Sequence, residues 1–306
     1  MKTLLFIGGT GFLGKSFFDY INGRKLKNIK LSKIIIISRK RKKIQSRIKI
    51  SYIKKNITNI NKIPITDYII YAANSDNNKE NLNGFYNFKR LINVKHKKTK
   101  ILFTSSGVVY GQKKTKNKIK ETDLINFKNV SKFSGYKKEY AKSKIIIENE
   151  FKRLGDRGFN VSIARLFSFI GKRILINKNF AITNLINQSQ DKKKNEIVLN
   201  SNTDVFRGYM NEDDLIRWIL KILDNANPNS NIYNVGSDES VTIKSLAKII
   251  GKKYDKKIVF SQKNKQISNK KNIDYYVPSI SKAKKELNLR IKYKLKDSLN
   301  QIINLK

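Results

Sequence analysis

The sequence predicts an α/β protein in which a doubly wound parallel sheet carries helices on both faces. A short apolar run at residues 3–7 leads into a glycine-rich turn and then into an amphipathic stretch, which is the order strand, turn, helix. Apolar runs and helix-patterned stretches then alternate through about residue 167, as they do around a parallel sheet. The chain has 306 residues, of which 39% are hydrophobic, so it can bury a large core.

Each element of the first half has its own signal. Residues 3–7 (TLLFI) and 33–38 (KIIIIS) are continuous apolar runs, which is typical of strands buried on both faces. Helical spacing of apolar residues from Leu82 to Leu91 predicts a helix over 79–97. In chain order, the expected strands cover 3–7, 33–38, 47–53, 67–73, 100–105 and 161–167, and the expected helices cover 12–21, 79–97 and 139–154.

The second half has shorter and looser elements. The expected helices cover 179–190, 213–223 and 243–250, and the expected strands cover 197–199, 206–210, 232–235 and 257–260. We expect residues 1–167 to form the larger domain, with later segments at about 200–240 returning to it. Residues 168–306 should form mainly a smaller C-terminal α/β domain.

Composition excludes several classes of protein. The absence of Cys excludes disulfides and thiolate metal sites, and a single His (His96) argues against a His-based metal centre or a Ser-His-Asp triad. We therefore expect no metal, and we place His96 at the surface near a helix end. The sequence has no apolar stretch long enough to span a membrane, and its N-terminal run is too short for a signal peptide, so we expect a cytoplasmic protein.

The net charge is extreme. Lys and Arg number 66 against 23 Asp and Glu, which gives +43 and suits a nucleic-acid binder. The basic residues are nevertheless spread along the whole chain among many Ile and Asn residues. Lys, Ile and Asn all have A/T-rich codons. We therefore favour genomic base composition as the cause, interpret 113–120 as a solvated basic loop, and keep nucleic-acid binding as a rival hypothesis.

The glycine turn after the first strand predicts a Rossmann-type dinucleotide site. Glycines at this place allow a tight turn, close approach of a pyrophosphate and close packing of the helix, whose N-terminus faces the phosphates. Ala72 and Ala73, at the end of the 67–73 strand, are also expected to bind the cofactor. The expected cofactor contacts in the turn itself are Gly8, Thr10, Gly11, Phe12, Leu13 and Gly14.

The end of the second strand bears on the choice of cofactor. A carboxylate there would accept hydrogen bonds from the 2′-hydroxyl of NAD, but this strand ends in Ser38 and Arg39. The planar guanidinium of an Arg can donate two parallel hydrogen bonds to a 2′-phosphate. We predict NADP, with NAD as the alternative.

Tyr140, Lys144 and Ser106 form the expected catalytic set. Tyr140 and Lys144 are four residues apart in a predicted helix, so they share a face. We expect the cation to lower the pKa of the phenol, which then exchanges a proton with a sugar hydroxyl or ketone as hydride moves. We also expect Lys144 to bind the nicotinamide ribose, and Ser106 to bind the reacting oxygen at the carboxyl edge of the sheet.

With these motifs the chain resembles the extended short-chain dehydrogenase/reductase family, which comprises nucleotide-sugar epimerases, dehydratases and ketoreductases. Gly8, Gly11 and Gly14 fit its GxxGxxG turn, and Tyr140 and Lys144 its YxxxK pair. Further matching stretches are 81–87 (NLNGFYN), 105–111 (SSGVVYG), 165–171 (RLFSFIG), 207–214 (RGYMNEDD), 233–236 (YNVG) and 281–287 (SKAKKEL).

The resemblance implies a nucleotide-diphosphate sugar as the substrate. It places Arg207 on the diphosphate and Ser168, where the family usually has Asn, near the sugar nucleotide. Arg165 is interpreted as a sheet or ion-pair residue. Gly107 and Val108 follow Ser106 where the 4,6-dehydratases carry an Asp-Glu pair, which argues against a dehydratase.

The hypothesis is an NADP-dependent 4-ketoreductase of deoxysugar or polysaccharide synthesis, with an NAD-dependent 4-epimerase as the alternative. The lysine-rich stretch at 113–128 is longer than usual for the family and is expected to border the site. The resemblance also implies a homodimer in which the helices after Leu82 and after Tyr140 pair.

Overall fold

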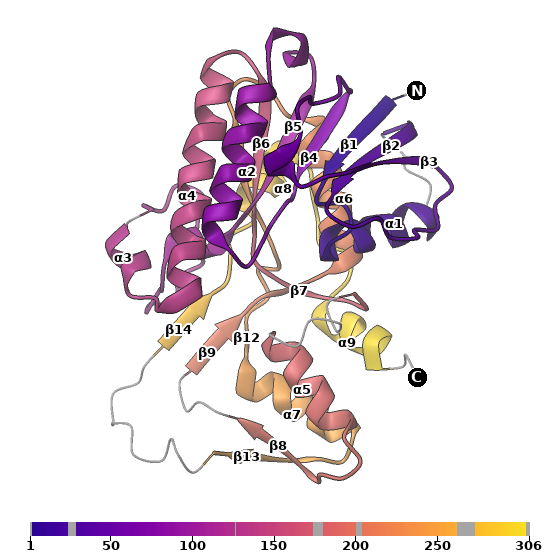
Figure 1. Cartoon of the computed structure of the whole chain (residues 1–306). Coiled ribbons are helices and arrows are strands. Elements are labelled where there is room, and N and C mark those ends of the chain that lie inside the picture. Colours follow the sequence, from indigo (N-terminus) through magenta and orange to yellow (C-terminus); the bar gives the residue numbers. More distant parts are fainter. Residues whose placement is uncertain are drawn as a thin grey trace.

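A seven-stranded parallel sheet forms the centre of the molecule (Figure 1). The computed structural model describes residues 2–23, 29–125, 127–173, 180–199, 204–261 and 273–303. The strand order is β11-β6-β5-β4-β1-β2-β3, and all neighbouring pairs are parallel. The strands are β1 (Lys2–Ile7), β2 (Leu31–Ser38), β3 (Lys49–Lys54), β4 (Tyr68–Tyr71), β5 (Lys100–Ser106), β6 (Asn160–Leu166) and β11 (Asn231–Val235).

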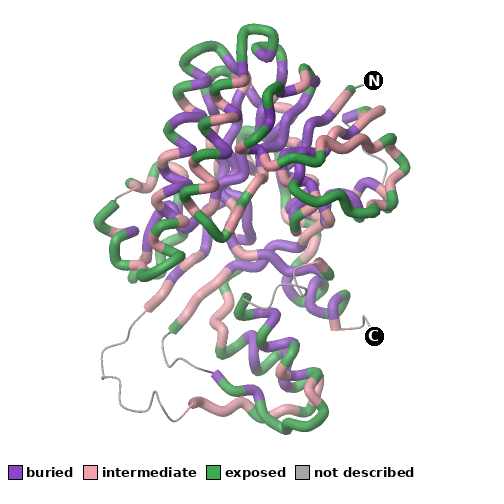
Figure 2. The backbone as a smooth tube through the Cα atoms, viewed as in Figure 1, coloured by how far each residue is buried: buried purple, intermediate pink, exposed green. Residues whose placement is uncertain are grey.

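Helices cover both faces of this sheet. Side chains alternate along β1, so Leu4 and Phe6 join one apolar core while Leu5 and Ile7 join the other. The first core contains α1 (Phe12–Gly23) and α6 (Glu212–Asp224), and the second contains α2 (Asn78–Leu91) and α4 (Gly135–Asp156). Figure 2 shows burial concentrated in the sheet and exposure on the outward sides of α2 and α4. The predicted doubly wound fold class is confirmed.

A smaller α/β part lies below the carboxyl edge of the sheet (Figure 1). Its core is built around α5 (Ala181–Gln190), α7 (Ile243–Lys253) and α9 (Leu295–Ile303). Strand β8 (Glu196–Leu199) pairs with β13 (Lys257–Phe260), and β9 (Asp204–Arg207) lies between β12 (Val241–Thr242) and β14 (Ile273–Tyr276). A short pair, β7 (Ser168–Ile170) with β10 (Tyr209–Asn211), leads from the sheet into this part.

The chain returns to the large sheet after entering the smaller part. Strand β11 closes the sheet beside β6, and α6 packs on the face that also carries α1. Helix α8 (Ser281–Leu287) packs on the same face. We propose on this basis that residues 1–167, with the returning segment, form the cofactor domain and that 168–306 form mainly the substrate domain; of 200–240, residues 200–203 lie outside the described residues.

The expected helix over 79–97 is shorter than predicted. It ends at Leu91, and Asn93 then caps a separate 3₁₀ turn, η2 (Val94–His96), by accepting a hydrogen bond from the Lys95 amide. His96 is buried rather than at the surface, because its ring fills space below this turn, with Nε2 3.2 Å from the Ile63 carbonyl oxygen. Local capping by Asn overrode the apolar periodicity here.

The expected strand over 206–210 is two strands in different sheets. Gly208 separates β9 from β10, and a Cβ atom there would lie 2.0 Å from the Ser237 carbonyl oxygen. The chain passes too close to the Ser237 backbone for any side chain at this point. The expected helix over 179–190 begins at Ala181, and Asn179 lies outside the described residues.

Candidate active site

The carboxyl ends of the strands open into one large cleft of about 1170 Å³. Strand order reverses between β1 and β4, and ligands of doubly wound sheets gather at such a point. The smaller part closes the other side of the cleft. The predicted site residues that line it are Gly8, Thr10, Gly11, Phe12, Leu13, Ser38, Arg39, Ala72, Ala73, Ser106, Tyr140, Lys144, Ser168 and Arg207.

The glycine turn packs directly against the end of β4. Gly8 has a φ of 85°, and a Cβ there would lie 2.7 Å from the Ala72 carbonyl oxygen and the Ala73 nitrogen. Helix α1 begins at Phe12, so its free N–H groups face the cleft. The turn therefore offers backbone donors and no side-chain bulk, which fits a pyrophosphate.

Gly14 differs from the other predicted cofactor contacts because it does not line the cleft. A Cβ at Gly14 would come 1.9 Å from the Gly9 carbonyl oxygen. This glycine allows α1 to start against the turn, so its part in the site is packing rather than contact with a ligand.

The end of β2 is strongly basic. The Ser38 hydroxyl donates to the Lys40 carbonyl oxygen at 2.8 Å, and the side chain of Arg39 is 60% exposed at the rim. Sequence reasoning missed Glu80, at the start of α2, whose carboxylate lies 3.5 Å from the Arg39 guanidinium. This acid belongs to the first turn of α2 rather than to the end of β2. The other cations that line this end are Lys40, Lys42 and Lys55.

Lys144 is buried beneath the cleft. Its Nζ donates to the Thr104 carbonyl oxygen at 3.1 Å and lies 5.4 Å from the centre of the Tyr140 ring. Burial lowers the pKa of Lys144 to about 8, against the influence of Glu148 one turn further along α4. The helix thus brings the Tyr and the Lys together as predicted.

The pKa of Tyr140 is shifted in the opposite direction from the prediction. Burial raises the pKa of Tyr140, Tyr136 and Tyr276 add to this, and hydrogen bonding to Ser106 only partly opposes it. The Tyr136 ring stacks on Tyr140 with centroids 5.7 Å apart. The expected lowering of the Tyr140 pKa is wrong for this chain because burial of the phenol disfavours the charged phenolate.

Tyr276 is a site residue that sequence reasoning missed. It reaches the cleft from β14, and its ring lies 4.7 Å from that of Phe167. A Cβ at Gly107 would come 2.7 Å from the Tyr276 hydroxyl, so this phenol lies beside the backbone that follows Ser106. Burial raises the pKa of Tyr276 to about 12. The pairing of β14 with β9 brings Tyr276 to the cleft, and no local sequence pattern predicts this pairing.

Arg207 is held by Asp274, a second residue of β14. One guanidinium nitrogen lies 2.7 Å from the Asp274 carboxylate, and another donates to the Phe206 carbonyl oxygen at 2.7 Å. Both side chains line the cleft. The site therefore pairs the predicted diphosphate contact with a carboxylate that the sequence did not point to.

Arg165 is a structural ion-pair residue, as interpreted from the sequence. It is buried with Glu148, at 2.7 Å, and a second nitrogen donates to the Tyr110 hydroxyl at 2.7 Å. This pair joins α4, which carries Tyr140, to β6 in the sheet.

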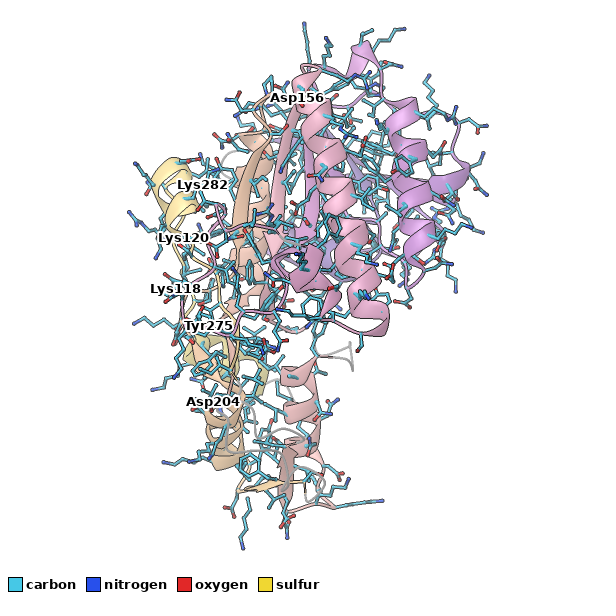
Figure 3. All side chains as sticks on the ribbon, turned by 90° about the vertical axis from the view of Figure 1, so that its left-hand side faces the viewer. Lys118, Lys120, Asp156, Asp204, Tyr275 and Lys282 are labelled. Carbon is cyan, nitrogen blue, oxygen red and sulfur yellow. The ribbon has the colours of Figure 1, made fainter. Side chains whose placement is uncertain are left out.

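The lysine-rich segment does not border the cleft. No described residue between Lys113 and Lys128 lines it. Instead, the Ile119 amide donates to the Val277 carbonyl oxygen at 2.9 Å, and Ile119 is buried. The segment is thus anchored alongside β14, while Lys118 and Lys120 lie on the same outer side of the molecule as Lys282 (Figure 3).

The sequence matches a known family over most of its length. The model of the NAD dependent epimerase/dehydratase family matches residues 4–236. The chain belongs to this family. The expectation of an extended short-chain dehydrogenase/reductase enzyme is therefore confirmed.

One relative matches about three-quarters of this chain at low sequence identity. UDP-glucuronic acid decarboxylase 1 of Arabidopsis thaliana is 24% identical over 228 residues, which are 74% of this chain and 49% of the relative. This chain thus spans about half the length of that relative.

Solved structures show the same fold over the whole chain. UDP-glucose 4-epimerase of Thermotoga maritima, solved with UDP-glucose, has a TM-score of 0.76 at 17% identity, over 98% of this chain and 97% of that one. dTDP-glucose 4,6-dehydratase of Bacillus anthracis, solved with NAD, has a TM-score of 0.76 at 18% identity, over 99% and 96%. RMD of Pseudomonas aeruginosa, solved with NADPH, has a TM-score of 0.74 at 18% identity, over 99% and 98%.

The described residues contain neither a membrane-spanning helix nor a metal-binding cluster. No helix among them is long and apolar enough to cross a membrane. No cluster of His, Cys, Asp and Glu in this part of the chain could hold a metal ion.

Proposed function

We propose that this epimerase/dehydratase family member is an NADP-dependent 4-ketoreductase of nucleotide-diphosphate sugars. The observation that carries the proposal is the basic end of β2, where Ser38 and Arg39 line the cleft beside three lysines. A 2′-phosphate is the ligand group that this end suits, since an Arg fork and neighbouring ammonium groups bind phosphate strongly. A dinucleotide would lie with its pyrophosphate on the Gly8–Gly11 turn.

The proton chemistry supports reduction. A raised pKa keeps the Tyr140 phenol protonated at neutral pH, so it is ready to donate a proton to a developing alkoxide. The bound nicotinamide would supply the hydride to the sugar carbonyl carbon. Ser106 would hold the carbonyl oxygen beside the phenol, and Lys144 would provide positive charge underneath.

The substrate side supports a nucleotide sugar. Arg207 and Ser168 line the cleft opposite the glycine turn, where a diphosphate and its sugar would extend from the reacting carbon. Gly107 and Val108 leave no carboxylate beside Ser106 for the removal of water. A ketone substrate of deoxysugar or polysaccharide synthesis is the proposal that these residues favour.

A 4-epimerase is the second candidate, and Glu80 favours it. Its carboxylate lies 3.5 Å from Arg39 and offsets part of the positive charge at the rim. In an epimerase, a tightly held NAD would accept a hydride from the sugar and return it to the same sugar. The likeness in fold to UDP-glucose 4-epimerase is compatible with this alternative.

Fluorescence titration of the purified protein with NADPH and NADH tests the proposal, after the preparation is assayed for cofactor that has co-purified. Reversible binding that prefers NADPH, with turnover of a 4-keto nucleotide sugar, is expected. Co-purified NAD would support the epimerase instead. If neither nicotinamide cofactor binds, the enzyme proposal falls, and nucleic-acid binding is the next test.

We also propose a homodimer through α2 and α4. The two helices pack side by side on one face of the sheet (Figure 1), and Tyr86 of α2 is exposed. Light scattering on a gel-filtration column measures the molar mass directly. A monomer at micromolar concentration would overturn this proposal.

A further inference from the structure

Lys137 lies at the mouth of the cleft on the same helix as Tyr140. It belongs to the first turn of α4 and precedes Tyr140 by three residues, so both side chains lie on one side of the helix. Both line the cleft. The next residue, Lys138, does not, so the two adjacent lysines have different surroundings.

The ammonium group of Lys137 is directed by an aromatic ring. Its Nζ lies 4.0 Å from the centre of the Phe133 ring, and Phe133 also lines the cleft. A cation over a ring face is held weakly and can still donate hydrogen bonds to a ligand. Lys137 forms no ion pair with any carboxylate in the described part of the chain.

Lys137 is within electrostatic reach of the Arg207–Asp274 pair on the opposite wall. Burial lowers the pKa of Lys137, the charge of Asp274 opposes this, and that of Arg207 adds to it. Three charges from two separate parts of the chain therefore meet across the substrate end of the cleft. Lys137 comes from α4, whereas Arg207 and Asp274 come from β9 and β14.

The charge balance of this end depends on Lys137. Arg207 and Asp274 are 2.7 Å apart and largely cancel each other. A diphosphate bears a negative charge on each phosphate, so a neutral pair alone cannot balance it. Lys144 is buried beneath Tyr140 and bonded to the Thr104 carbonyl oxygen, which leaves Lys137 as the uncompensated cation among the described residues that line this end.

We propose that Lys137 is a second phosphate contact for the nucleotide-diphosphate sugar and acts with Arg207 from the opposite wall. This rests on the proposed function for the substrate class, but not on the choice between reduction and epimerisation. Lys137 and Tyr140 are on one helix turn, so a diphosphate held by Lys137 also fixes the distance from the nucleotide to the phenol. Lys137 is therefore a residue that positions the substrate, not a catalytic residue.

Calorimetric titration of the full chain, saturated with its nicotinamide cofactor, tests this proposal. The probes are UDP, dTDP, GDP and CDP, and the tightest of these is compared with its monophosphate. Lys137→Met should lower the affinity for the diphosphate by about tenfold or more, since a charge-assisted hydrogen bond is lost. The preference for diphosphate over monophosphate should shrink, and Lys137→Arg should restore most of it.

Matched controls separate this role from damage to the fold. Lys138→Met makes the same change at the neighbouring residue and should leave the affinity for the diphosphate unchanged. The affinity for the cofactor should be unaltered in all variants, which shows that the sheet and glycine turn are intact. Lys137→Gln gives a second variant if the methionine variant does not fold.

Each outcome has a distinct meaning. If the unaltered chain binds a diphosphate and Lys137→Met binds it as tightly, the role of Lys137 is overturned and the proposed function stands. If Lys137→Met and Lys138→Met weaken binding equally, the effect is general surface charge, and the proposal is again wrong. If the unaltered chain binds the cofactor but none of the diphosphates, the proposed substrate class fails together with this inference.

Discussion

The hydroxyl of Tyr276 lies over Gly107, where a Cβ atom would come 2.7 Å from it. The ring of Phe167 is equally close to the same point. Two aromatic side chains therefore fill the space that a side chain at position 107 would occupy, directly after Ser106. A glycine at 107 is what allows β14 to complete the wall of the cleft.

Gly107→Ala should reduce turnover because the added methyl group must displace Tyr276 or Phe167. A shift of about 1 Å in a positioning residue can cost about 10²-fold in rate. Steady-state kinetics on the reduction of a 4-keto nucleotide sugar measures the loss. Gly23→Ala is the control, since a Cβ there meets nothing within 4 Å. Equal rates for both variants would show that the aromatic wall has no part in the reaction.

Tyr140→Phe should lower kcat by about 10²- to 10⁴-fold, because the proton donor is removed while the ring remains. Binding of the nicotinamide cofactor should be retained, and fluorescence titration checks this. Tyr136→Phe removes a hydroxyl from the ring stacked on Tyr140 and should have a much smaller effect. A larger loss for Tyr136→Phe would mean that the proton donor has been assigned to the wrong tyrosine.

The value of kcat/KM should fall as the pH rises through about 8. Burial lowers the pKa of Lys144 to about 8, so the ammonium is present below this pH and is lost above it. The profile of kcat/KM from pH 6 to 10 reports this ionisation in the free enzyme. Lys144→Arg keeps its charge throughout and should flatten the alkaline side, whatever its absolute rate. An unaltered alkaline fall in that variant would assign the ionisation to another group.

Arg39→Asp should lower the affinity for NADPH by about tenfold or more and raise the affinity for NADH. The substitution replaces a cation that binds the 2′-phosphate with a carboxylate that accepts a hydrogen bond from a ribose hydroxyl. The ratio of the two dissociation constants is the measurement. Arg41→Asp makes the same change in charge two residues further on, at a side chain that does not line the cleft. Similar shifts in both variants would show that overall charge, and not a defined phosphate site, governs the preference.

Glu148→Gln should lower the free energy of unfolding by about 3–5 kcal/mol, because it leaves Arg165 charged and unpaired in the interior. Both side chains are almost fully buried. Urea denaturation measures the change. Glu139→Gln breaks the exposed pair with Lys142 and should cost about 1 kcal/mol or less. A small effect at Glu148 would mean that water reaches the Arg165 guanidinium.

The sheet and the glycine turn could be predicted because their signals are local. The apolar runs at β1 and β2 and the turn at Gly8 are contiguous in sequence, and each dictates its own structure. Gly208 shows the limit of that approach. The pattern from Phe206 to Met210 favours one strand, but only the backbone of Ser237 explains why it breaks.

The cleft was predicted more completely on one wall than on the other, where only Arg207 and Ser168 were expected. Ser106, Tyr140 and Lys144 belong to recognisable motifs, whereas Asp274 and Tyr276 arrive through the pairing of β14 with β9. The direction of the Tyr140 pKa shift was also beyond a sequence argument. It depends on how deeply Tyr136, Tyr276 and the neighbouring walls bury the phenol, and spacing along α4 carries no information on that.

The position of β11 at the edge of the sheet has a consequence for biosynthesis. Strand β6 receives its outer neighbour only when residues 231–235 have been made, after the chain has already built part of the smaller lobe. A nascent chain or fragment that ends at residue 167 exposes the unpaired edge of β6, which can pair with another chain. Truncation there should therefore give an aggregating product, and the ribosome must deliver about three-quarters of this protein before the last strand of its central sheet can pair.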